Sequence, residues 1–126
     1  MQGDHARSAE LFSQVLAIRR EIGGRSGICV SAACAAATLA ASSSSNFRRP
    51  AAIAYYAALA RAAELNYRFE PEDLQVANDA GARLDAAAAS GEISAEQLAA
   101  WKAEGEAMSF DELAEFVLAE LERLRG

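Results

Sequence analysis

Alanine recurs along the whole chain, singly and in runs, and this restricts the possible folds more than any other feature of the sequence. The 126 residues include 32 alanines and only two prolines, Pro50 and Pro71. Alanine is the best helix former because it loses no side-chain entropy when a helix forms. No stretch alternates apolar and polar residues as a half-buried strand does. The sequence therefore predicts an all-α protein that forms a single domain over residues 1–126.

Charge is distributed unevenly along the chain. Residues 1–50 contain six Arg and three acidic residues, a net charge of +3, whereas residues 51–126 contain six basic and fifteen acidic residues, a net charge of −9. Proteins that bind nucleic acid concentrate Lys and Arg in one patch. The acidic total therefore argues against nucleic acid as a direct partner. Two interpretations of the asymmetry stay open: a solvated acidic surface, or docking of the basic part onto an acidic neighbour.

The only two cysteines, Cys29 and Cys34, lie five positions apart. On a helix their Cα atoms would be roughly 8–9 Å apart, beyond the roughly 7 Å that a disulfide can bridge. We expect two free thiols in a reducing, cytoplasmic environment. The single histidine, His5, lies far upstream, so no metal site and no cofactor is expected.

The most apolar run covers residues 28–41, and it is the one segment that could suggest a membrane span. It is shorter than the roughly 20 residues that a spanning helix needs. The first 25 residues are charged, unlike a secretory signal. We predict neither a membrane span nor a signal peptide.

Turn residues and caps divide the chain into about six helices. Gly23 and Gly24 end the first, and each proline suits the first turn of a helix because its missing N–H is not needed there. Ser94 with Gln97, and Ser109 with Glu112, have the spacing of capping boxes. The apolar pairs of the matching hydrophobic staples are Ile93 with Leu98 and Met108 with Leu113. The predicted helices cover about 4–22, 27–42, 50–66, 71–90, 94–104 and 109–125, with a polar loop at 42–46.

The first and third predicted helices share a pattern of a small residue, an aromatic residue four positions later and an aliphatic residue three positions after that. A small residue lets a neighbouring helix approach, and the larger ones interlock with it at the next turn. We therefore assign these positions to packing between repeats, 44 residues apart. The two sets are Ser8, Phe12 and Val15, and Ala52, Tyr56 and Leu59.

This pattern resembles the second helix of a tetratricopeptide (TPR) repeat, preceded by "GDHARS" in place of the turn that leads into it. The long offset is similar to that of the extended repeats in MalT-like regulators. The resemblance implies that helix 4–22 is the second half of a repeat whose first helix is absent. It also implies antiparallel hairpins in a TPR-like right-handed superhelix, with repeat-like helices over 1–66 and a C-terminal helical cap over 71–126.

Two longer segments, "LAIRREIGGRSGICVS" and "LAAWKAEGEAMSFDELAEFVLAEL", resemble the C-terminal end of the TPR region in large bacterial signal-transduction ATPases and LuxR-type transcriptional regulators. The resemblance implies a non-catalytic interaction or regulatory module whose partner is a protein. Neither a phosphate-binding loop nor a helix-turn-helix is present, so ATPase activity and DNA binding are not carried over. The alternative is a self-associating helical protein, a homodimer without an independent ligand.

No residue is predicted to be catalytic. His5 has no Ser, Cys or paired carboxylate at a suggestive spacing, and the register of Tyr56 favours the core over a ligand site. Trp101 is expected to pack under the last helix rather than to anchor a partner. That last helix is apolar on more than one side, so something must cover it. The candidate interaction residues are Leu11, Ile18, Trp101 and Phe116.

Overall fold

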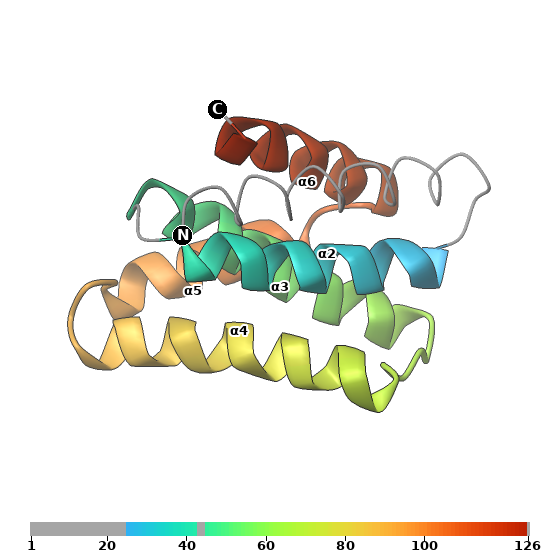
Figure 1. The fold of residues 1–126 in the computed structure, drawn as a ribbon, viewed down its shortest axis with the longest axis horizontal. Coiled ribbons are helices and arrows are strands. Elements are labelled where there is room, and N and C mark those ends of the chain that lie inside the picture. The colour runs from blue at the N-terminus through green and yellow to red at the C-terminus, as the bar shows by residue number, and fades with distance from the viewer. Residues whose placement is uncertain (1–24, 43–44, 126) are drawn as a thin grey trace.

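A computed structural model describes residues 25–42 and 45–125, and this part of the chain consists of helices joined by turns and loops, with no strand (Figure 1). The all-α prediction is confirmed. The predicted helix 4–22, with its candidate residues Ser8, Leu11, Phe12, Val15 and Ile18, lies outside the described residues. The elements are α2 (Arg25–Ala41), the short 3-10 helix η1 (Ser45–Phe47), α3 (Arg48–Glu64), α4 (Pro71–Ala89), α5 (Ala95–Glu106) and α6 (Phe110–Arg125).

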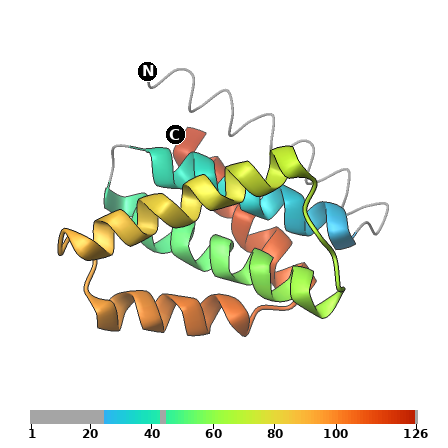
Figure 2. The same ribbon diagram turned by 90° about the horizontal axis from the view of Figure 1, so that it is seen from below.

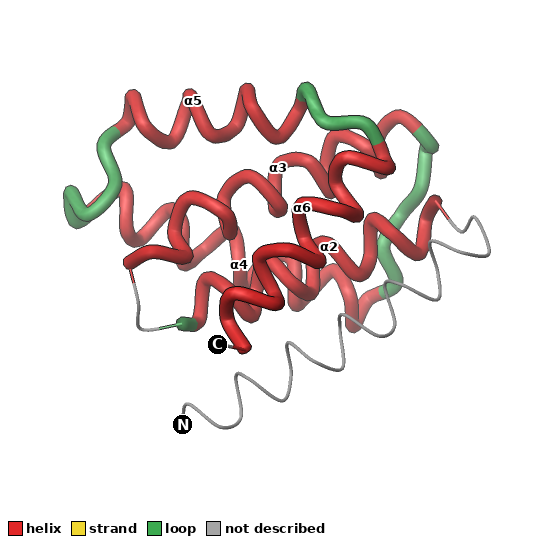
Figure 3. Tube along the Cα trace, turned by 90° about the horizontal axis from the view of Figure 1, so that it is seen from above, coloured by secondary structure: helices red, strands yellow, loops and turns green. Residues whose placement is uncertain are grey.

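Helix α3 lies at the centre of the arrangement and contacts α2, α4, α5 and α6. Helix α2 in turn contacts α4 and α6. Figure 2 shows α5 along one side of α3 and α2 on the other, and Figure 3 shows α6 crossing the bundle from above. Every other described α-helix is therefore positioned by direct packing on α3.

The main core is built mostly from alanine. In the main cluster, α3 and α4 contribute only alanines and α2 contributes alanines and Ile28, whereas α6 contributes one alanine and three larger side chains. These larger side chains are Leu113, Val117 and Leu121, all 0% exposed. Alanine at a helix crossing lets two backbones approach closely, so little space is left between them. The buried alanines of this cluster are Ala32, Ala33, Ala35, Ala36, Ala54, Ala57, Ala58, Ala77, Ala80 and Ala114.

A close helix approach involves Gly105 of α5. A Cβ atom placed on Gly105 would lie 2.5 Å from the carbonyl oxygen of Ile53 and 3.1 Å from the backbone nitrogen of Ala57. The backbone of α5 therefore rests directly on that of α3, and only glycine leaves the space for it.

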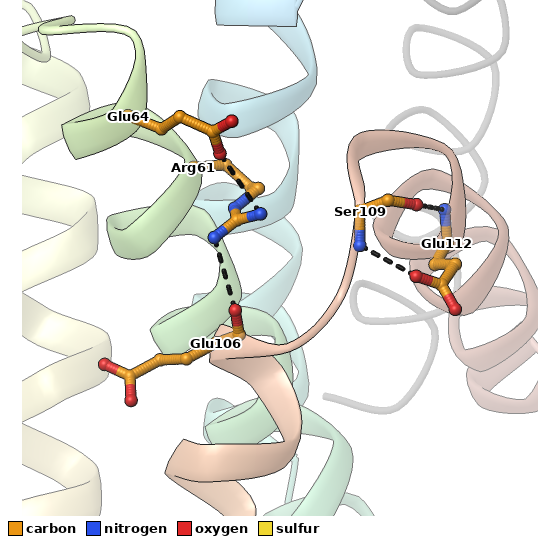
Figure 4. Close-up of polar contacts among 5 residues, drawn as sticks. All are labelled: Arg61, Glu64, Glu106, Ser109 and Glu112. Carbon is orange, nitrogen blue, oxygen red and sulfur yellow. Dashed lines mark hydrogen bonds and ion pairs between the residues drawn. The ribbon is translucent and has the colours of Figure 1, made fainter.

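Polar contacts on the same face of α3 hold α5 in this position. Positions 49, 53, 57 and 61 follow a spacing of four, which places them on one face of the helix. Arg49 forms an ion pair with Glu104 at 2.5 Å, and Arg61 donates to the backbone carbonyl of Glu106 at 3.2 Å (Figure 4). The end of α5 is thus tied to α3 on both sides of Gly105.

Both predicted capping boxes are confirmed. Ser94 Oγ accepts a hydrogen bond from the Gln97 N–H at 3.0 Å, and Gln97 Oε1 accepts one from the Ser94 N–H at 3.1 Å. Ser109 and Glu112 make the same reciprocal pair at 3.1 and 2.9 Å (Figure 4). The hydrogen bonds from the backbone and then the side chain of Ser109 lower the pKa of the Glu112 carboxyl.

Helix boundaries follow the turn residues with one local correction. Pro71 is the first residue of α4, as predicted, and Gly91 takes a φ of 82° after this helix. Helix α3 begins at Arg48, two residues earlier than predicted, and Pro50 still lies in its first turn. The predicted loop at 42–46 is partly helical, because Ser45 and Asn46 belong to η1, which leads directly into α3.

Candidate functional site

The C-terminal end of α3 reverses the chain through a left-handed residue. Asn66 has a φ of 54°, a conformation that Asn tolerates better than most residues with a side chain. The Asn66 N–H donates to the carbonyl of Ala63 at 3.1 Å, and the Tyr67 N–H donates to that of Ala62 at 2.9 Å. These two bonds define a Schellman motif, which turns the chain back so that Tyr67 follows the last turn of α3 closely.

The start of α4 places a second apolar pair beside this turn. Glu70, the residue before Pro71, is extended, with a ψ of 153°, and the helix begins at the proline. Phe69 precedes the N-cap and Leu74 is the fourth residue of the helix, the two positions of a hydrophobic staple. The end of α3 and the start of α4 therefore each bring large apolar side chains to the connection between them.

A hollow of about 380 Å³ lies at this connection, and we call it the α3–α4 hollow. Its rim carries Leu59, 36% exposed, and Leu74, 45% exposed, the two exposed large hydrophobic residues of the described chain. The rings of Tyr67 and Phe69 meet edge to face, with centroids 5.6 Å apart. The lining residues are Leu59, Ala62, Ala63, Tyr67, Arg68, Phe69 and Leu74.

Acidic residues flank several of the lining residues along the sequence. Glu64, next to Ala63, is paired with Arg61 at 3.1 Å (Figure 4). Glu70, Glu72 and Asp73, which flank Phe69 and Leu74 along the chain, form no ion pair within residues 25–42 and 45–125. Among the lining residues, Arg68 supplies the only positive charge. The hollow is thus lined mainly by apolar side chains.

A second group of aromatic residues packs against buried side chains and does not line the hollow. This second cluster contains buried Ala52, Leu84 and Ile93, with the half-buried rings of Tyr55, Tyr56 and Trp101 among the side chains packed on it. Burial, and then the nearby Asp85 carboxylate, raises the pKa of both tyrosines. A Cβ on Gly81 would lie 2.5 Å from the Tyr55 hydroxyl oxygen, so this ring fits against the α4 backbone.

The structure places the candidate residues from the sequence in three different settings. Ala52 is fully buried and Tyr56 half-buried in the second cluster, whereas Leu59 is exposed at the rim of the hollow. Trp101 belongs to the second cluster, which contains no α6 residue, so the expectation that it packs under the last helix is wrong. Its α5 position instead directs it towards α3 and α4. Phe116 packs partly against the main cluster.

The two cysteines are free thiols, as predicted. Desolvation by burial raises the pKa of Cys29 to about 11, although the nearby Arg61 opposes the shift. Because the thiolate is the nucleophile and the metal ligand, this thiol is unreactive near neutral pH. Over residues 25–42 and 45–125, no group of three or more His, Cys, Asp or Glu could hold a metal ion. None of the helices in that part of the chain is both long enough and apolar enough to cross a membrane.

Sequence reasoning did not select Tyr67, Arg68, Phe69 or Leu74, although local signals for them exist. Asn66 at the end of a helical pattern is typical of a left-handed cap. Phe69 and Leu74 have the staple spacing around a helix start. No protein family, curated protein or solved structure matches the chain. The α3–α4 hollow therefore stands as the candidate site on its own geometry.

Proposed function

We propose that this chain is a non-catalytic helical interaction module whose α3–α4 hollow receives an apolar segment of another protein. One observation carries the proposal: both exposed large hydrophobic residues of the described chain, Leu59 and Leu74, lie on the rim of the same hollow. Contiguous apolar surface rimmed by polar groups marks interaction sites in soluble proteins.

The setting of the module is part of the proposal. The TPR-like register of Ala52, Tyr56 and Leu59 supports a TPR-like superhelix that belongs to a signal-transduction ATPase or a LuxR-type regulator. Two free thiols support the cytoplasm as its compartment. The acidic charge supports a protein rather than a nucleic acid as its partner.

The test is a selection of displayed peptides on the chain, followed by calorimetry on the selected sequences. Leu59→Ser with Leu74→Ser should weaken binding by about 10- to 100-fold, because each half-exposed Leu contributes about 1 kcal/mol of further burial. The matched control is Ala99→Ser with Ala103→Ser, at exposed positions of α5, which should bind as the parent chain does. Selected peptides that bind the leucine variant unchanged would exclude the hollow as the site.

Self-association through the same two leucines is the alternative occupant. Sedimentation velocity at micromolar concentration distinguishes the two functions. A monomer that binds peptides supports the module. A dimer that dissociates in the leucine variant, with no peptide bound by either form, supports the homodimer instead.

A further inference from the structure

We infer that the segment received by the α3–α4 hollow binds as an extended strand, whose main chain pairs with the connection between the two helices. This inference rests on the proposed function and adds the conformation of the partner. The connection consists of residues 67–70, which follow the turn at the end of α3, precede Pro71 and belong to no helix. Figure 2 shows it as a stretched run of chain from the end of α3 to the start of α4.

The connection is extended, and it forms one side of the hollow. Glu70 has a φ of −59° and a ψ of 153°, which are close to the angles of an extended polyproline II chain. Side chains two positions apart share one face of an extended chain. The rings of Tyr67 and Phe69 do so, because they meet edge to face with centroids 5.6 Å apart. Both residues line the hollow.

One edge of the connection carries main-chain groups that have no partner in the described chain. The Tyr67 N–H donates to the carbonyl of Ala62, so this edge faces the end of α3. In an extended chain, the N–H and C=O of the next residue point to the opposite edge. That edge presents the N–H and C=O of Arg68 and the N–H of Glu70. None of these three groups forms a hydrogen bond within residues 25–42 and 45–125.

A free main-chain edge beside an apolar hollow favours an extended partner over a helical one. When a peptide binds by strand addition, main-chain hydrogen bonds provide affinity and pockets for alternate side chains provide specificity. The hollow, with a volume of about 380 Å³, is near the lower end of ligand pockets and suits one or two large apolar side chains. A helix presents anchors from successive turns, and its own N–H and C=O groups are already paired internally. An extended peptide therefore satisfies both features of the site.

The main experiment tests the backbone of the partner and leaves the protein unchanged. The probe is the tightest selected peptide, together with analogues that each carry one N-methyl group in place of a backbone N–H. We expect losses of about tenfold at alternate positions beside the apolar anchor, because only alternate N–H groups of a paired strand point to the connection. Methylation at the positions between them should have little effect. Calorimetry measures each analogue.

A variant of Glu70 locates the pairing on the protein. Glu70→Pro removes the free N–H and is compatible with the fold, because the φ of −59° at this position matches that of proline. It should weaken binding by about threefold to tenfold, the effect of one hydrogen bond. Glu70→Ala is the matched control, since it removes the same carboxylate and keeps the N–H, and it should bind as the parent chain does. Circular dichroism checks that both variants are folded.

The outcomes separate this inference from the proposed function. Tolerance of N-methylation at every position overturns the paired strand and leaves the hollow as an interaction site. Losses at several consecutive positions overturn it too, because they indicate a bound helix. Equal binding by the Glu70→Pro and Glu70→Ala variants shows that the partner does not pair with this edge. If no selected peptide binds the parent chain, the proposed function itself is wrong.

Discussion

The surfaces of α3 that pack against α2 and α5 and the end of α3 that leads to α4 are built from different kinds of residues. The first region, which we call the closed side, uses alanines of α2 and α3 and Gly105 of α5, so that the helix backbones approach closely. The second, the α3–α4 hollow, uses leucines and aromatic rings that remain partly exposed. Small side chains bring helices together, whereas large ones gathered at a turn leave room between them.

One substitution made in both regions tests this difference most strongly. Ala57 on the closed side is fully buried, and Ala63, on the same helix, is exposed and lines the hollow. Ala57→Leu should lower the free energy of unfolding by about 3 kcal/mol, because overpacking a filled core forces the backbones apart. Ala63→Leu should change it by less than about 0.5 kcal/mol, as a surface substitution does. Urea denaturation measures both, and equal losses would show that the two regions are packed alike.

Gly105 gives the next largest effect. Gly105→Ala should lower the free energy of unfolding by about 2 kcal/mol, because the new Cβ collides with backbone atoms of α3. Helix propensity alone predicts the opposite sign, a gain of about 1 kcal/mol. The sign of the change in the free energy of unfolding, measured by thermal and urea denaturation, therefore distinguishes the two effects. A stabilised variant would mean that α5 does not pack on α3 as described.

The caps of α5 and α6 lie outside both regions, so variants of the caps provide a reference for the losses of stability measured in each region. Ser94→Ala with Ser109→Ala should cost about 2 kcal/mol in all, because an N-cap typically contributes about 1 kcal/mol. The sites lie on different helices, so the two losses should add. Single and double variants measured by urea denaturation check this, and no loss beyond error would contradict the capping boxes.

Asn66 tests the turn that forms the hollow. Asn66→Ala should lower the free energy of unfolding by about 1 kcal/mol, because alanine is strained in the left-handed conformation. Asn66→Gly serves as the control, since glycine adopts this conformation freely and should restore or exceed the original stability. If both variants lose the same amount, the Asn side chain and not the backbone conformation would be what stabilises the turn.

The smallest effect is a pH dependence at the α6 cap. Hydrogen bonds from Ser109 lower the pKa of Glu112 from its ordinary value of 4.5 in the folded state. Because the folded pKa is depressed, the stability from this group is present above pH 4.5 and is lost as the pH falls through the folded pKa. Titration of the Glu112 carboxyl by NMR should show a smaller shift in Ser109→Ala than in the parent, because the variant loses the side-chain hydrogen bond and keeps the backbone N–H of residue 109.

Elements defined by neighbouring residues were predictable, and those defined by distant ones were not. Both capping boxes were recognised because each depends on residues three positions apart, and Pro71 marked a helix start for an equally local reason. The neighbours of Trp101 were predicted wrongly, because they depend on which helices α5 crosses. The exposure of Leu59 likewise depends on the direction that α4 takes from the end of α3. The repeat-like register of α3 does not predict that direction.

The alanines of the closed side have a consequence for motion as well as for packing. An alanine side chain has no rotamers, so the alanines between α2 and α3 have no alternative side-chain arrangement to adopt. Sliding of packed helices relies on small adjustments at the interface, and here such adjustments would require the backbones themselves to separate. We therefore expect α2 and α3 to keep their relative position. Adjustment at the α3–α4 hollow should instead involve the rings of Tyr67 and Phe69, which do have alternative rotamers.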